Sequence, residues 1–129
     1  MYRPLRIVLF VHGLITLAGA IVLTVFTTAI PSMVGISLQP KDYLLVYLVA
    51  TAELAVAVLS FGAIRLTDSA GIGLVVTTLV VLHGASGVLD VVYMGLTETS
   101  GALIANTVAR FTVVAVLLLV WRAARAHQT

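Results

Sequence analysis

Cysteine is absent from this chain of 129 residues, and charged residues make up only 9% of it. Without cysteine the protein can form neither a disulfide nor a thiolate metal site, and it has no cysteine nucleophile. A soluble domain carries roughly 25% charged residues, whereas 61% of this chain is hydrophobic and its mean hydropathy is +1.20. A fold of this length cannot bury so much apolar surface in its own core. We therefore expect lipid as its solvent, and one domain.

Proline is also scarce, with three residues in the chain, and long apolar runs dominate. Four segments have about 20 residues or more, the length that crosses a bilayer. The connections between them are short, which favours antiparallel neighbours. The first run is longer than a signal peptide and lacks a small-residue cleavage site, so we expect it to remain as a span. We predict an all-α integral membrane protein, a four-helix up-down bundle in one domain (1–129), with spans at about 5–30, 43–64, 72–94 and 102–121.

The connecting segments carry residue types that start and stop helices. Residues 31–42 contain two prolines and a glycine, and we predict an ordered external loop there. Asp68 and Ser69 are helix-starting residues in the second connection. Thr99 or Ser100 is expected to cap the last helix.

Positive charges indicate the orientation in the membrane. The side opposite the arginines has only Lys41, beside Asp42 and Glu98. The positive-inside rule therefore predicts that both termini are cytoplasmic. The pI near 9.4 does not indicate nucleic-acid binding, because the arginines lie at the membrane edges and form no basic patch. These edge arginines are Arg3, Arg6, Arg65, Arg122 and Arg125.

Five polar residues within the spans have overlapping depths, and this is the most informative feature of the sequence. At 1.5 Å per residue, Glu53 lies about 16 Å below the outer surface, Arg110 about 13 Å and His83 about 18 Å. Asp90 and Asn106 lie about 7 Å below it. Charged side chains inside a membrane are costly, so they indicate a functional site by default.

The charges of this cluster predict acid–base chemistry. Arg110 cannot lose its proton, so a carboxylate from Glu53 or Asp90 must meet its charge. One guanidinium cannot balance the charges of two carboxylates, so one of the two carboxyls is favoured to keep its proton. The cluster then contains an acid, a base and a fixed cation. We assign catalytic roles to Glu53, Asp90 and Arg110, and substrate- or water-positioning roles to His83, Asn106, Tyr93, Ser86 and Tyr47.

Each of these signals has a plainer explanation that the sequence leaves open. Glu53 and Arg110 could be a structural ion pair between two helices. Asp90 is high enough to reach headgroup water, and a lone His83 is more often a satisfied hydrogen-bonding group than a catalyst. Tyrosines near the membrane surface commonly form an aromatic belt.

We expect no metal and no other cofactor. No HxxH or HxxxH spacing occurs, and Arg110 beside the carboxylates disfavours a bound cation. His12 lies about 10 Å from the inner surface. In a core of about 30 Å this is close to the level of His83, so a haem between these histidines is the least favoured alternative.

The layout resembles the DoxX-like group of small four-span bacterial membrane proteins. The features that match are the overall length, an arginine-flanked first span, and a glutamate midway along the second span in ATAELAVAVLSFGAIR (Ala50–Arg65). The resemblance implies a multi-pass protein of the bacterial plasma membrane. The set of Glu53, Asp90, Arg110 and Asn106 is also similar in its chemistry to the site of limonene epoxide hydrolases, although those enzymes are soluble and have a different fold.

We predict a small membrane enzyme that uses this cluster on an apolar, isoprenoid- or polyketide-like substrate, by epoxide opening, cyclisation or isomerisation. The alternatives are a proton-linked carrier and a non-catalytic accessory subunit. A carrier with four spans needs a homodimer, and Gly101, Ala105 and Ala109 form a small-residue stripe suited to that contact. The expected partners are the lipid bilayer and a lipophilic small molecule, with no nucleic acid.

Overall fold

The computed structural model describes residues 3–126, and all regular secondary structure in this part of the chain is helical. Four of its helices are long and apolar enough to cross a membrane, as predicted. The elements in chain order are α1 (Arg3–Val25), α2 (Ala29–Met33), a single 3-10 turn η1 (Pro40–Asp42), α3 (Tyr43–Ala63), α4 (Ser69–Leu96) and α5 (Gly101–Ala126).

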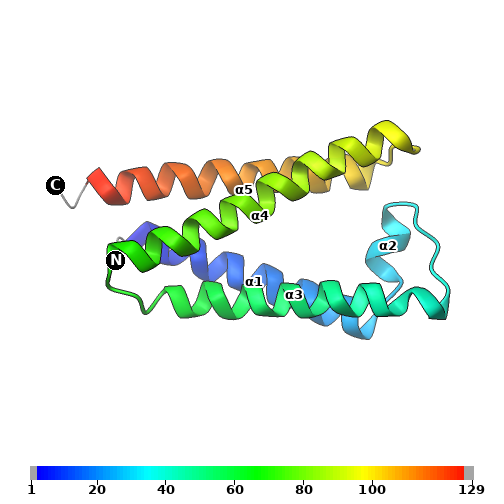
Figure 1. The fold of residues 1–129 in the computed structure, drawn as a ribbon, viewed down its shortest axis with the longest axis horizontal. Helices are drawn as coiled ribbons and strands as arrows, with labels where there is room; N and C mark the ends of the chain where they lie inside the picture. Colours follow the sequence, from blue (N-terminus) through cyan, green and yellow to red (C-terminus); the bar gives the residue numbers. More distant parts are fainter. Residues whose placement is uncertain (1–2, 127–129) are drawn as a thin grey trace.

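The four long helices run up and down in succession, and they form two hairpins (Figure 1). α1 packs mainly on α3, and α4 packs mainly on α5. The start of α1, the end of α5 and the α3–α4 connection lie at one end of the molecule, which we call the closed end. At the other end, the open end, the two hairpins diverge and the short α2 lies between them (Figure 1).

The first predicted span, 5–30, is wrong at its end. α1 stops at Val25, and after a turn the chain forms α2, which contains Pro31. A proline inside a continuous helix loses a hydrogen bond and clashes with the preceding turn, whereas it is tolerated in the first turn of a helix. The break before α2 places Pro31 in such a first turn. Gly35, with φ of 81°, then turns the chain out of α2 in a conformation that suits glycine.

Two helix starts predicted from the sequence are confirmed. Asp68 caps α4, where its carboxylate accepts a hydrogen bond from the Gly71 amide at 2.6 Å. Of the two candidates for α5, Ser100 is the cap, and its hydroxyl oxygen accepts from the Leu103 amide at 3.1 Å. These bonds satisfy amides that have no partner inside the helix, and they fix the short connections that keep neighbouring helices antiparallel.

Large apolar side chains fill the closed end. Leu5, Leu9, Leu79 and Leu117 are fully buried there, and they come from three of the long helices. Elsewhere the helices expose apolar side chains, among them Leu74, which is 70% exposed. A helical protein with an apolar exterior is suited to lipid, because lipid tails solvate such side chains.

Leu79→Ala is expected to reduce the free energy of unfolding by about 2 kcal/mol, because it leaves a cavity among leucines that cannot close around it. The matched control on the same helix is Leu74→Ala, whose side chain faces outward. That control is expected to stay within about 0.5 kcal/mol of wild type. Equilibrium unfolding in mixed detergent micelles measures both variants. An equal loss in the two would contradict the burial of Leu79 in the core.

Candidate functional site

The α4–α5 hairpin brings together three of the polar residues predicted for the site. Asp90 lies six residues before the end of α4, and Asn106 and Arg110 lie five and nine residues after the start of α5. Because the connection is short and the helices are antiparallel, these positions meet at one level. Asn106 and Arg110 are four apart and therefore share the α5 face that meets Asp90.

One oxygen of Asp90 receives most of the hydrogen bonds of this cluster. Oδ2 accepts from Nδ2 of Asn106 at 3.0 Å, from Nε of Arg110 at 3.1 Å and from the Thr107 hydroxyl at 3.4 Å. The other oxygen, Oδ1, makes no hydrogen bond to the part of the chain that the structure describes. The side chains of Asp90 and Arg110 are 20% and 26% exposed, so the ion pair is largely shielded. The carboxylate is thus held on one side and open on the other.

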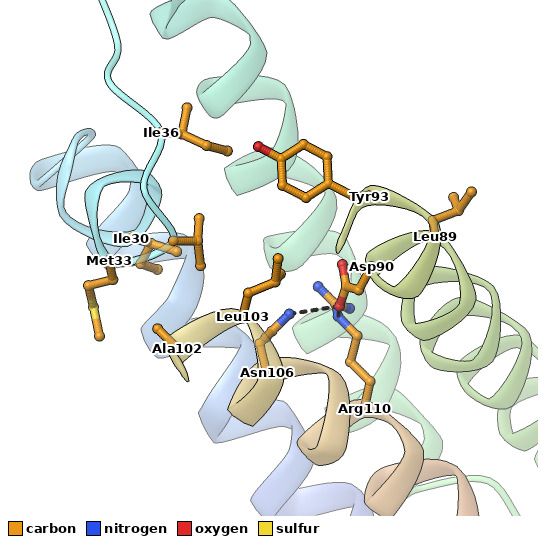
Figure 2. Close-up of a pocket in the computed structure, with 11 residues that line it drawn as sticks. Ile30, Met33, Ile36, Leu89, Asp90, Tyr93, Ala102, Leu103, Asn106 and Arg110 are labelled. Carbon is orange, nitrogen blue, oxygen red and sulfur yellow. Dashed lines mark hydrogen bonds and ion pairs between the residues drawn. The ribbon is translucent and has the colours of Figure 1, made fainter. Parts of the chain in front are cut away.

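A cavity of about 640 Å³, which we call the larger cavity, borders this ion pair. Figure 2 shows Ile30, Met33 and Ile36, from α2 and the loop after it, across the cavity from Tyr93 on α4 and Leu103 on α5. Asp90, Asn106 and Arg110 lie together in the same view, with the amide of Asn106 directed at the carboxylate. A mostly apolar cavity with a few convergent polar groups is the usual form of a small-molecule site.

Glu53 lines a second, smaller cavity, of about 370 Å³, which Arg110 also lines. This smaller cavity shares Ile30, Asn106 and Arg110 with the larger one, and His83 also lines it. Glu53 has no ion pair or hydrogen bond to another side chain among residues 3–126. The question left open by the sequence is therefore settled, since Asp90 and not Glu53 is the partner of Arg110.

His83 is hydrogen-bonded to His12, which was not predicted to be part of the site. Its Nε2 lies 2.7 Å from Nε2 of His12, and the two rings meet edge to face. Nδ1 of His12 lies 2.9 Å from the Ser60 hydroxyl, which donates to the Val56 carbonyl at 2.8 Å. This chain of hydrogen bonds joins α1, α3 and α4, and we call it the histidine chain. It links the two hairpins at the border of the smaller cavity.

The histidine chain argues against a haem between these two residues. An iron held by both rings needs their nitrogens roughly 4 Å apart, twice a metal–nitrogen bond of about 2 Å. The two Nε2 atoms lie 2.7 Å apart and bond directly to each other. No group of three or more metal-binding side chains occurs within residues 3–126.

We compared the chain with protein-family models, curated proteins and solved structures. No match was found. Function is therefore inferred from the geometry of the two cavities.

Two of the predicted substrate-binding residues lie away from both cavities. Ser86 is half-buried on α4 and lines neither cavity. Tyr47 is 43% exposed near the start of α3, where its ring contacts that of Tyr43, and this position agrees with an aromatic belt. Tyr93, in contrast, lines the larger cavity.

Three residues of the site were missed from the sequence. Thr107 follows Asn106 directly, but threonine is too common in apolar helices to be noticed. Ser60 shares the small-residue face of α3 with Glu53, which was the available signal. His12 was considered beside His83 only as a haem ligand, because their depths are close, and not as its hydrogen-bond partner.

His12→Leu is expected to lower the free energy of unfolding by about 1–3 kcal/mol, since Nε2 of His83 loses its partner in a shielded position. Adding His83→Leu should cost less than the sum of the two single changes, because both ends of the bond are then removed together. Thr78→Val is the control, because its exposed hydroxyl bonds only to the Leu74 carbonyl of its own helix. If the loss of stability in the double variant equals the sum of the two single losses, the hydrogen bond between His12 and His83 is contradicted.

Proposed function

We propose that this protein is a small integral membrane enzyme that acts on a lipophilic substrate by acid–base chemistry. The observation that carries the proposal is the position of Arg110, which is paired with Asp90 at the larger cavity and also borders the smaller cavity with the unpaired Glu53. A purely structural ion pair needs no second carboxyl and no apolar cavity beside it. Charged groups inside a membrane segment are costly and persist mainly where they serve function.

The hydrogen bonds support different roles for the two carboxyls. Asp90 receives three donors on Oδ2, and its Oδ1 is available as a base. Glu53 has no cationic partner within bonding distance, and in its protonated form it would serve as the acid. Arg110 neutralises the carboxylate of Asp90, and this separates the role of Asp90 as the base from that of Glu53 as the acid. Asn106 and Tyr93 border the larger cavity and would orient the substrate.

Epoxide opening illustrates how the groups would act together. Asp90 takes a proton from water as the water oxygen forms a bond to an epoxide carbon. The carbon–oxygen bond breaks, and the released oxygen takes the proton of Glu53. The product is a diol, and transfer of a proton from Asp90 to Glu53 restores the enzyme. Cyclisation and isomerisation use the same acid and base.

The apolar walls of the larger cavity support an isoprenoid- or polyketide-like substrate. We further propose that the basic closed end faces the cytoplasm of a bacterial cell, as the positive-inside rule and the resemblance to DoxX-like proteins suggest. Substrate would then reach the cavities from the opposite leaflet or the outer face.

The experiment that tests the proposal is mass spectrometry of small molecules that co-purify with wild type and with a variant carrying both Glu53→Gln and Asp90→Asn. A discrete apolar, oxygenated compound enriched in the variant is expected, because substrate binds but does not react. The matched control is Glu98→Gln, a carboxyl in the α4–α5 connection outside both cavities. Bulk phospholipid alone in all three samples would contradict an enzyme with a stalled substrate and favour an accessory subunit.

A proton-linked carrier is the second candidate, and the difference between the two ends of the bundle favours it. Both cavities lie beyond the packed core of the closed end, as expected for a site that is accessible from one side. If the protein is a carrier, we expect proton flux in liposomes that depends on Glu53. We also expect a dimer, with the exposed stripe of Gly101, Ala105 and Ala109 as its contact surface. Substrate conversion without flux would exclude it.

A further inference from the structure

Residues 28–37, which we call the lid segment, form one wall of the larger cavity. The segment contains α2 and the loop after it, and it lies between the two hairpins at the open end (Figure 1). Its Ile30 and Ile36 lie across the cavity from Leu103 (Figure 2). No residue of the segment is buried, and Met33 is 67% exposed. The segment therefore covers the larger cavity without belonging to a packed core.

The lid segment borders a cavity toward each of the two hairpins. Another cavity, of about 270 Å³, is lined by this segment together with Leu23 of α1 and Val49 of α3. The larger cavity is lined by the same segment together with residues of α4 and α5. Ile30, Val34 and Ile36 line both cavities. Side chains beside empty space lack the dispersion contacts of a packed interior, so the segment is held only loosely against either hairpin.

Within residues 3–126, the lid segment makes no hydrogen bond to any of the four long helices. Its hydrogen bonds are local, such as the bond that the Ile36 amide donates to the Pro31 carbonyl at 2.9 Å. The Ser32 hydroxyl likewise donates to the Ala29 carbonyl at 2.9 Å. Displacing the segment as a unit therefore breaks only apolar contacts with the long helices. Lipid tails are as apolar as these side chains and can replace such contacts.

Gly35 fixes the direction in which the chain leaves α2, and its backbone angle is what holds the lid segment in place. Its φ of 81° lies in the left-handed region, which residues with a Cβ disfavour. A Cβ at this position would meet no atom within 4 Å, so a substitution acts on the backbone and not on a neighbour. Hinges of lids are commonly a few loop residues that absorb such a change in backbone angles.

We infer that the lid segment is a movable lid, which opens about Gly35 and the turn after α1 and admits lipophilic molecules to the larger cavity from the lipid at the open end. This inference rests on the proposed function, which makes the larger cavity the substrate site. It adds the route by which substrate arrives and product leaves. Segments with few buried contacts open at a low free-energy cost, so the route requires no separation of the two hairpins.

The test uses the absence of cysteine from the chain, because an introduced thiol is then the only one. Leu103 is 5% exposed behind the lid segment, so the thiol of Leu103→Cys should react with N-ethylmaleimide in lipid nanodiscs only when the lid opens. Labelling that is slow relative to opening follows the open fraction. We expect Gly35→Ala to speed this labelling about tenfold, equivalent to about 1.4 kcal/mol, a usual size for a Cβ in the left-handed region.

Two controls separate the lid from other movements. Gly95→Ala is the matched glycine substitution, because its Cβ also meets no atom within 4 Å and its φ is not positive, and it should leave the labelling rate unchanged. Leu117→Cys is a thiol in the closed end, and it should stay unreactive with and without Gly35→Ala. An unchanged rate at Leu103→Cys in the Gly35→Ala variant would overturn the inference. An equal acceleration at Leu117→Cys would also overturn it, since the whole bundle would then be opening.

Distances between two spin labels measure the movement directly, by electron paramagnetic resonance. With labels at Ser32→Cys on α2 and Thr78→Cys on α4, both exposed positions, we expect Gly35→Ala to add a longer and broader distance component. Labels at Thr51→Cys on α3 and Thr78→Cys report on the two hairpins and should keep their distance. A change in both pairs would mean that the hairpins separate, and it would overturn the inference. Neither measurement depends on turnover, so the proposed enzyme is tested separately.

Discussion

Arg110→Met is expected to lower the free energy of unfolding by roughly 2–3 kcal/mol, the largest effect on stability among the polar residues. The change leaves Asp90 as an uncompensated charge in a largely shielded position. Exposed ion pairs contribute less than about 1 kcal/mol, whereas breaking a buried pair costs about 3–5 kcal/mol. The partly shielded pair lies between these cases.

A double-mutant cycle separates the ion pair from other effects of the substitution. Asp90→Asn added to Arg110→Met should recover much of the loss, because the unpaired charge is removed. Arg122→Met is the matched control, since Arg122 is exposed in the last turns of α5. Unfolding in mixed micelles is measured for wild type, for both single variants, for the double variant and for the Arg122→Met control. A coupling energy near zero would mean that the pair does not form in the membrane environment.

Glu53→Gln is expected to lower the turnover of an identified substrate at least about 100-fold, the usual contribution of a general acid. The amide keeps the size of the side chain but cannot transfer its proton. Binding of substrate should change little, so the loss should appear in kcat rather than in KM. Stability should also change little, because the Glu53 side chain has no ion pair to lose.

Two further variants make this kinetic result specific. Asp90→Asn should lose turnover to a similar degree, but its neutral amide no longer balances the charge of Arg110, so the free energy of unfolding should fall as well. Glu98→Gln should retain full turnover, because Glu98 lies outside both cavities. Full activity of the Glu53 variant would remove this residue from the catalytic roles and leave Asp90 as the only carboxyl in question.

The sequence predicted the membrane helices well because their signal is local. Apolar length defines each span, and capping residues such as Asp68 and Ser100 mark where α4 and α5 begin. The end of α1 was harder, because Thr24 to Thr28 contain no residue that forbids a helix. Only the position of Pro31 requires a break before it, and the sequence does not say how far before.

The sequence predicts how deep each site residue lies, but it does not predict how each helix is rotated about its axis. Depth along a helix follows from residue counts, and this placed Asp90, Asn106 and Arg110 together correctly. Which face of one helix meets which face of another depends on packing. The choice between Glu53 and Asp90 as the partner of Arg110, and the pairing of His12 with His83, therefore needed the structure.

The Asp90–Arg110 pair lies within one helical hairpin, and this has a consequence for biogenesis. A hairpin that carries both charges can neutralise them before it meets the rest of the protein, so α4 and α5 can leave the translocon as one unit with no isolated ion. Glu53 has no such partner in α1 or α3, and a lone carboxyl can enter lipid in its protonated form. The two hairpins can therefore insert in sequence and associate afterwards, with the hydrogen bond between His12 and His83 forming only when they meet.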